Sequence, residues 1–305
     1  MSHRMWHLVL SRRVWNSHGL AIESELHSQH VQYSMDITDS VDQVAEVVTR
    51  KAGEGVTRWV AVGGDGAVHW MVNAIMGLDD SVRADHTLGI LPLGTGCDFA
   101  RVAQIPGDLE MAISILQSGE ATAIDVGTIE GEWGRRYFIN VADIGIAAVA
   151  AHRAEQLRGL GQLRYLAALW MSLPSARRSE MQIQSDSDEI TAKCLAIILA
   201  NGRYFGGGFE VAPNAELRDG QIDMLVAKSA WWNLPRLLRD VIRRTHLQRP
   251  DIVSAKVRTV QITGAALTVE ADGEHLGNTP AKVKILPAAI KVQLPNHRNT
   301  DAEPL

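Results

Sequence analysis

The sequence predicts an α/β amino-terminal domain with a parallel sheet, followed by a β-rich carboxy-terminal domain. Strand and helix signals alternate as far as Asp125, and short strands separated by turn residues follow it. The 305 residues are enough for two medium-sized domains, each with its own core. The expected division assigns residues 1–125 to the first domain and 126–287 to the second, with 288–305 packing back on the first.

In the first domain, short apolar runs alternate with segments of helical spacing. Val44 and Val48 belong to the apolar stripe of one such segment, Thr38 or Asp39 can cap it, and glycines end it. The expected strands are 5–10, 59–64 and 88–94, and the expected helices are 38–55, 67–77 and 108–116. Short apolar strands between helices favour a parallel sheet covered on both faces.

In the second domain, alternating polar and apolar residues between turn signals predict strands. The expected β segments lie within 128–145, 181–202, 221–228, 257–264, 266–273 and 281–294.

Composition limits the location and the partners. The net charge of −5 argues against broad binding to nucleic acid, since proteins that do so are usually basic. Cys97 and Cys194 lack metal-ligand spacing, which favours a reduced intracellular protein. No segment approaches the roughly 18 uninterrupted apolar residues of a spanning helix, and the lack of a sustained apolar run before Arg12 argues against a secretory signal. We therefore expect a cytoplasmic protein that meets a membrane only peripherally, at its inner face.

Two glycine-rich loops follow predicted strands. The first is Gly63-Gly64-Asp65-Gly66, and the second runs from Gly94 through Gly96 to Asp98. Glycines let the backbone approach an anion, and a helix start offers unpaired N–H groups. Taken alone, the first loop also fits a plain tight turn. Loops after neighbouring parallel strands meet at one edge of the sheet, where ligands bind, so the pair favours a phosphate site.

These loops resemble those of the diacylglycerol kinase catalytic-domain family, which includes bacterial lipid kinases and the sphingosine and ceramide kinases. The likeness continues in residues 204–208 (YFGGG), 212–223 (APNAELRDGQID) and 272–274 (DGE). The resemblance implies transfer of a phosphoryl group from ATP to a lipid hydroxyl, such as that of diacylglycerol. It also implies a first domain similar to those of NAD kinase and phosphofructokinase.

The resemblance implies roles for particular residues. Glu274 matches the family's general base, which takes the proton of the substrate hydroxyl, and Asp65 is a second catalytic candidate. The implied nucleotide-binding residues are Thr38, Gly63, Gly64, Asp65, Gly66, Ala67, Val68, His69 and Thr95. From its residue pattern alone, the stretch around Glu274 also fits an ordinary polar hairpin.

The resemblance further implies a Mg²⁺ site in residues 216–221. Its ligands would be the Asp219 carboxylate and the backbone carbonyls of Glu216 and Gln221, because Mg²⁺ prefers oxygen donors. Without the family, this stretch fits a turn between strands. A looser candidate for the active-site metal is an acidic network formed by Asp65, Asp98 and Asp125.

The sequence departs from the family around the nucleotide. Residues 11–16 lack the usual Asn-Pro and glycine of a first phosphate loop, and the other replacements are Ala67 for Thr, Trp70 for Glu and Cys97 for Asn. Arg12 and Arg13 could supply phosphate charge from this loop, or could be solvated loop arginines. The changes favour altered nucleotide contacts, weak activity or a lapsed enzyme.

The segment 229–250 combines two tryptophans with five arginines, namely Trp231, Trp232, Arg236, Arg239, Arg243, Arg244 and Arg249. Aromatics beside a basic helix suit an anionic membrane surface, although a helix packed on its own domain fits as well. Together with the weaker candidate 152–178, this segment could line an apolar cleft for the lipid substrate.

The leading hypothesis is therefore an ATP- and Mg²⁺-dependent lipid kinase. Two alternatives stay open: a pseudokinase that binds lipid or nucleotide without turnover, and an NAD kinase-like enzyme. A homo-oligomer is compatible with the sequence, which does not identify the lipid.

Overall fold

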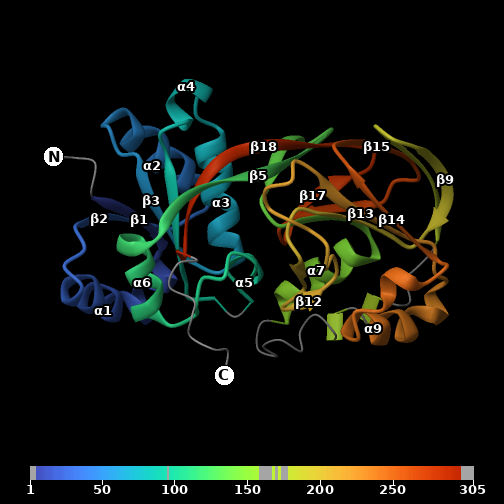
Figure 1. Cartoon of the computed structure of the whole chain (residues 1–305), viewed down its shortest axis with the longest axis horizontal. Coiled ribbons are helices and arrows are strands. Elements are labelled where there is room, and N and C mark those ends of the chain that lie inside the picture. Colours follow the sequence, from blue (N-terminus) through green and yellow to red (C-terminus); the bar gives the residue numbers. More distant parts are fainter. Residues whose placement is uncertain (1–4, 95, 158–166, 169–170, 173–177, 297–305) are drawn as a thin grey trace. The chain divides into compact units, whose positions relative to one another are not determined.

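The computed structural model describes residues 5–94, 96–157, 167–168, 171–172 and 178–296 (Figure 1). The chain divides into two compact units. Unit 1 comprises the residues up to Ile124 together with the segment that begins at Ala289, and unit 2 is Asp125–Ala288. Thr95, most of the segment 152–178 and the polar tail, about which the sequence makes predictions, lie outside the described residues.

Unit 1 is a parallel sheet between two pairs of helices. Its elements are β1 (Trp6–Ser11), α1 (Arg12–Ser28), β2 (Tyr33–Thr38), α2 (Asp42–Gly53), β3 (Arg58–Gly63), α3 (Asp65–Met76), α4 (Asp80–Arg83), β4 (Thr87–Pro92), α5 (Asp98–Val102) and α6 (Leu109–Ser118). The strand order is β2-β1-β3-β4, with every pair parallel. Helix α1 packs with α6 and α2 with α3 (Figure 1). Right-handed crossovers place the two pairs on opposite faces, so β4 is buried throughout and β3 is buried from Trp59 onward.

Two predictions about unit 1 need correction. Residues 11–16 are expected to form a loop, but residues 12–16 begin helix α1, whose buried residues are only Gly19, Ile22 and Leu26. Such a narrow apolar stripe gives a weak helical signal. Helix α2 begins at Asp42 rather than near Thr38, and its N-cap Val41 makes no side-chain capping bond.

Unit 2 is a sandwich of two antiparallel sheets. Its elements up to the middle of the unit are β5 (Glu120–Gly131), β6 (Gly134–Phe138), β7 (Val141–Gly145), α7 (Ile146–Gln156), β8 (Ser179–Ser185), β9 (Glu189–Cys194), β10 (Ala196–Ala200), β11 (Tyr204–Phe205) and β12 (Phe209–Glu210). The rest are β13 (Ile222–Ala227), η4 (Trp231–Asn233), α9 (Leu234–Ile242), η5 (His246–Gln248), β14 (Ile252–Val257), β15 (Thr259–Gly264), β16 (Thr268–Ala271), β17 (Glu274–Asn278) and β18 (Ala281–Leu294).

One sheet of unit 2 has the order β14-β13-β10-β7-β16-β17. In the other, β18 pairs with β15, β15 with β8 and β8 with β9, all antiparallel. Apolar side chains from both sheets form a single buried core, including Ile144 and Ile197 from the first sheet and Ile183 and Ile262 from the second. The parallel α/β unit and the β-rich unit confirm the predicted fold class.

Two strands belong to both units. Strand β5 passes the division between Ile124 and Asp125, and β18 passes it between Ala288 and Ala289. The last part of β18 pairs in parallel with β4 through Lys291 and Val292, and so completes the sheet of unit 1. Among the described residues, no helix is long and apolar enough to cross a membrane.

Candidate functional site

The carboxyl edge of the parallel sheet in unit 1 brings together the ends of four strands. Ser11 at the end of β1 lies opposite Thr38 at the end of β2, and Gly63 at the end of β3 lies opposite Pro92 at the end of β4. The two glycine-rich loops therefore leave neighbouring strands at the same edge, as the sequence predicts.

The two glycine-rich loops touch at Gly64 and Gly94. A Cβ on Gly94 would lie 2.4 Å from the Gly64 Cα, so no other residue fits there without moving the backbone. Gly63 has φ +148°, which favours glycine. These positions leave bare backbone at the sheet edge, which is the surface that a phosphate group needs.

Asp65 joins the same two loops through hydrogen bonds. Its Oδ2 accepts the backbone N–H of Asp98 at 3.0 Å, and its Oδ1 accepts that of Phe99 at 3.0 Å. The carboxylate thus satisfies two N–H groups at the start of α5, which would otherwise lack helical partners. In this structure Asp65 organises the second loop, by holding the start of α5.

Cys97 stands between Gly94 and α5 with φ +50°, in the left-handed region. Asn adopts this region more readily than Cys does, so the family's usual residue would fit the backbone better. Its thiol donates to the Gly94 carbonyl at 3.4 Å. Burial, reinforced by the nearby Asp65 carboxylate, raises the pKa of the Cys97 thiol to about 11, so the sulfur is an un-ionised thiol at neutral pH.

The other predicted nucleotide residues lie at or behind this edge. Thr38 is buried and its hydroxyl donates to the Leu10 carbonyl at 3.4 Å. Val68 and His69 are buried within α3, and the backbone N–H groups of Ala67 and Val68 both donate to the Gly64 carbonyl. A ligand at this edge would therefore meet backbone, rather than the side chains of residues 68 and 69.

The first phosphate loop of the family has no counterpart here, because β1 runs directly into α1. Ser11 caps the helix, with its Oγ accepting the N–H of Val14 at 3.3 Å. Arg12 forms a two-bond ion pair with Asp39, at 2.5 and 3.1 Å. This hydrogen-bonded pairing lowers the pKa of the Asp39 carboxyl. The positive charge of Arg12 is thus already matched, and both Arg12 and Arg13 lie in the first turn of a helix.

In unit 2, the predicted base Glu274 begins β17, directly after a tight turn. The turn residue Asp272 has φ +50° and Gly273 has φ +95°. The Asp272 carboxylate accepts the backbone N–H groups of Ile139, Asn140 and Val141, at 2.9, 2.9 and 3.0 Å. These bonds tie the turn to the start of β7, so Asp272 positions Glu274, which is half-buried.

The predicted metal loop 216–221 is tied down by Asp125. The Asp125 backbone N–H donates to the Leu217 carbonyl at 2.7 Å, and its Oδ2 accepts the N–H of Gly220 at 2.7 Å. The other oxygen, Oδ1, accepts the N–H of Ala288 on β18 at 2.8 Å. Asp125 therefore holds the backbone of the loop 216–221 in place, and both of its carboxylate oxygens accept backbone hydrogen bonds.

Both oxygens of the Asp219 carboxylate also have protein partners. Oδ1 accepts the N–H of Gln221 at 2.9 Å, and Oδ2 accepts from the Lys256 ammonium at 2.5 Å. The hydrogen bond to Asp219 raises the pKa of Lys256. Burial raises the pKa of the adjacent Asp223, and Lys256 opposes that shift.

This arrangement bears on the predicted Mg²⁺ at residues 216–221. Mg²⁺ requires closely spaced oxygen donors, and the carboxylate that would provide the charge faces an ammonium instead. Within the part of the chain that the structure describes, no group of three or more His, Cys, Asp or Glu side chains could hold a metal ion. The donors present fit a protein cation better than a resident Mg²⁺, although the three-residue assignment itself stays a prediction.

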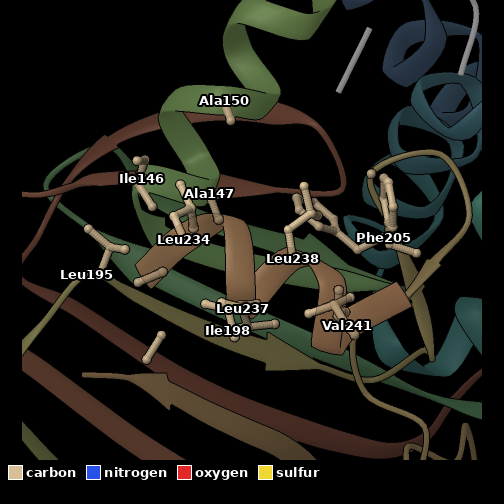
Figure 2. A pocket seen from close by; sticks show the side chains of 15 residues that line it. Ile146, Ala147, Ala150, Leu195, Ile198, Phe205, Leu234, Leu237, Leu238 and Val241 are labelled. Carbon is tan, nitrogen blue, oxygen red and sulfur yellow. The ribbon is translucent and has the colours of Figure 1, made fainter. Parts of the chain in front are cut away.

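An apolar pocket of about 140 Å³ lies in unit 2, over the sheet that contains β10 and β13 (Figure 2). Figure 2 shows α9 along one side, with Leu234, Leu237, Leu238 and Val241 pointing inward, and Ile146 and Ala147 of α7 on another. Ile198 forms part of the floor and Phe205 stands at one end. Every lining residue is apolar or glycine, so the pocket suits a hydrocarbon chain.

Comparison with known proteins agrees with this geometry. The model of the diacylglycerol kinase catalytic domain matches residues 13–129, and that of the YegS C-terminal NAD kinase beta sandwich-like domain matches residues 140–294. A Mycobacterium tuberculosis protein named "Diacylglycerol kinase" is 30% identical over 249 residues, covering 80% of this chain and 79% of the relative. The chain belongs to the diacylglycerol kinase catalytic-domain family.

Two further proteins are similar to this chain over most of its length. A Pectobacterium atrosepticum protein named "Probable lipid kinase YegS-like" is 30% identical over 272 residues, covering 88% of this chain and 87% of the relative. A crystal structure of a Bacillus anthracis diacylglycerol kinase superposes with a TM-score of 0.74 at 20% identity, covering 97% and 98% of the two chains. That structural likeness supports the fold alone.

In this member of the lipid kinase family, most arginines of the segment 229–250 make ion pairs. Arg249 bridges Asp240 and Asp251, and Arg244 pairs with Glu210. Arg239 pairs with Asp240 as well. Arg236 and Arg243 are exposed, as are Trp232 (63%) and Ile242 (60%). The segment therefore combines a packed apolar face with an outer face that exposes two large apolar and two basic side chains.

Three residues of this lipid kinase were missed by the sequence argument. Lys256 reaches the predicted metal loop, and Asp143 and Glu270 are fully buried acids on neighbouring strands. Opposite charges on two strands, such as those of Lys256 and Asp223, are compatible with pairing of these strands. Nothing in the local sequence specifies which strands pair or in what register.

Proposed function

We propose that this protein transfers the γ-phosphate of ATP to the hydroxyl group of a lipid such as diacylglycerol. The observation that carries the lipid acceptor is the apolar pocket beside α9, which accommodates hydrocarbon and offers almost no polar partner. Membership of the lipid kinase family supports the phosphoryl transfer. The pocket and Glu274 belong to the same unit, so one unit would present both the lipid and the base.

In this proposal different residues of the chain have different roles in the reaction. Glu274 takes the proton from the lipid hydroxyl, and Asp272 holds its turn in place. The bare backbone at Gly63, Gly64 and Gly94 receives the nucleotide phosphates. Mg²⁺, as the usual companion of ATP, supplies positive charge to the phosphates when it is bound.

The outer face of α9 supports a proposal for how the protein reaches its substrate. Trp232 and Ile242 expose apolar surface beside Arg236 and Arg243. Aromatic and basic residues together favour the interface of an anionic membrane. The helix that lines the pocket with its inner face would thus lie against the membrane with its outer face.

The test is transfer of labelled phosphate from ATP to a panel of lipids in mixed micelles, with Mg²⁺ and with chelator. Leu238→Trp fills the pocket, whereas Leu20→Trp makes the same substitution at an exposed leucine on α1, away from the pocket and from α9. We expect Mg²⁺-dependent product on one lipid class, at least about tenfold less of it with the Leu238 variant, and little change with the Leu20 control. An equal effect of both substitutions would refute the pocket as the acyl site.

A second candidate function is a pseudokinase that binds nucleotide or lipid without turnover. The direct passage of β1 into α1, with Arg12 paired to Asp39, favours it because the first phosphate loop is missing. ATP binding measured by calorimetry, without transfer to any lipid of the panel, would select this alternative.

A further inference from the structure

We propose that Lys256 is the resident cation of the loop 216–221, so that this loop keeps its shape through an internal ammonium rather than through Mg²⁺. The inference goes beyond the proposed function, because it concerns how the loop is held and applies to a kinase and a pseudokinase alike. It rests on three features of unit 2.

The first feature is the position of the ammonium. Lys256 Nζ lies 2.5 Å from Asp219 Oδ2 and 3.7 Å from Asp223 Oδ2. The two carboxylates are only 17% and 15% exposed, and the lysine is 33% exposed. A metal ion bound to the same oxygen of Asp219 would have to displace the ammonium, because both cannot occupy that side of the carboxylate.

The second feature is the way the sheet delivers the lysine. Strands β13 and β14 are antiparallel, and Asp223 lies directly opposite Lys256. Side chains at opposed positions share one face of a sheet and interact at close range. The long side chain of Lys256 can therefore reach past Asp223 to Asp219 at the end of the preceding loop. The pairing is thus built into the register between β13 and the edge strand β14.

The third feature is that the loop is already tied by the protein. Asp125 binds it at two places, through the Leu217 carbonyl and the Gly220 N–H. The remaining oxygen of Asp219 accepts the N–H of Gln221 within the loop itself. Glu216 is exposed to solvent, whereas Asp219 and Asp223 are largely buried, and Lys256 supplies positive charge to both of these carboxylates.

The test is thermal unfolding of the full chain without nucleotide, in millimolar Mg²⁺ and in EDTA at matched ionic strength. We expect the wild-type melting temperature to be the same in both. Lys256→Met should melt about 2–4 °C lower and regain part of the loss in Mg²⁺, because Asp219 and Asp223 then face each other without a cation. The melting temperature of Lys256→Arg should not change with Mg²⁺, since arginine keeps the positive charge.

Lys282→Met is the matched control, because Lys282 is an exposed lysine on a strand of the same unit. It should leave the melting temperature and its insensitivity to Mg²⁺ unchanged. A wild-type melting temperature that rises saturably with Mg²⁺, and no longer does so in Asp219→Asn, would overturn the proposal. A rise that survives Asp219→Asn comes from elsewhere in the chain and leaves the proposal standing.

If Lys256→Met does not fold, Mn²⁺ binding to the wild type and to Asp219→Asn decides the question by electron paramagnetic resonance. Equal Mn²⁺ binding by the two proteins supports the internal ammonium. A site present in the wild type and lost in Asp219→Asn refutes it. None of these readouts depends on phosphoryl transfer, so failure of the proposed kinase activity would be seen separately.

Discussion

Asp143 on β7 and Glu270 on β16 lie directly opposite one another, and neither side chain reaches solvent. They occupy the sheet face that also carries Ile198, a floor residue of the apolar pocket, because Ile198 lies opposite Asp143 on β10. Burial raises the pKa of the Asp143 carboxyl well above its usual range. The protein thus keeps a carboxylic acid group within an apolar setting.

The first prediction concerns the pH dependence of stability. Below the unfolded-state pKa of Asp143, both states are protonated and the full stability is present. As pH rises towards the raised folded-state pKa, the unfolded chain loses its proton while the folded one keeps it, so stability falls by up to about 1.4 kcal/mol per pH unit. Asp143→Asn should remove this decline in urea unfolding measured at a series of pH values.

Glu132→Gln is the control for that series, because Glu132 is exposed in the turn between β5 and β6. It should leave the slope unchanged. A wild-type stability that stays level or increases between pH 5 and 8, with Asp143→Asn giving the same profile, would contradict the prediction.

The second prediction concerns Asp65. Asp65→Ala leaves the N–H groups of Asp98 and Phe99 without their partner and should cost about 1–2 kcal/mol of unfolding free energy. Asp79→Ala is a fair comparison, since Asp79 stands at the N-cap of the short helix α4 but makes no side-chain capping bond. Its cost should be near zero. Equal costs in urea unfolding would argue against the capping role.

The third prediction separates Glu274 from Asp272. Glu274→Gln should lower phosphoryl transfer by about 10²–10⁴-fold while leaving the melting temperature unchanged. Asp272→Ala should lower both, because three backbone N–H groups lose their acceptor. Full activity in the Glu274 variant would show that another group takes the proton.

The fourth prediction concerns the outer face of α9. Replacing Arg236 and Arg243 by Glu should weaken binding to vesicles that contain anionic lipid, by about fivefold for each arginine. Trp232→Ala should weaken it further. Lys193→Glu, which changes the same charge at an exposed position on β9, should have little effect. If all variants bind the vesicles equally in a sedimentation assay, this face does not contact the membrane.

The predicted features that the structure reproduces are local ones. The turns at 63–66 and 272–274 each depend on a few consecutive glycines and acids with characteristic backbone conformations. The arrangement at the carboxyl edge then follows from the general rule for parallel strands. Helix α1 was not predicted because only three of its residues are buried, which leaves a weak apolar pattern. Strand β2 was not predicted either, and it is partly exposed along most of its length.

The features that sequence reasoning missed are contacts between distant segments. Lys256 meets Asp219 across 37 positions, and Asp272 binds residues more than 130 positions earlier. Both depend on strand register, which is set by the whole β unit rather than by a motif. The same reasoning explains why the Mg²⁺ site that the family resemblance implies at Asp219 took no account of Lys256: the sequence neighbours of Asp219 do not reveal the cation that the sheet brings to it.

The paired course of β5 and β18 has a consequence for biosynthesis. Strand β4 is made before residue 100, but the strand that covers its edge, β18, comes only near the end of the chain. On the ribosome, the unit that is synthesised first is therefore the unit that is completed last. Until then β4 presents an open edge to its surroundings, and a fragment that stops before β18 would keep that edge permanently.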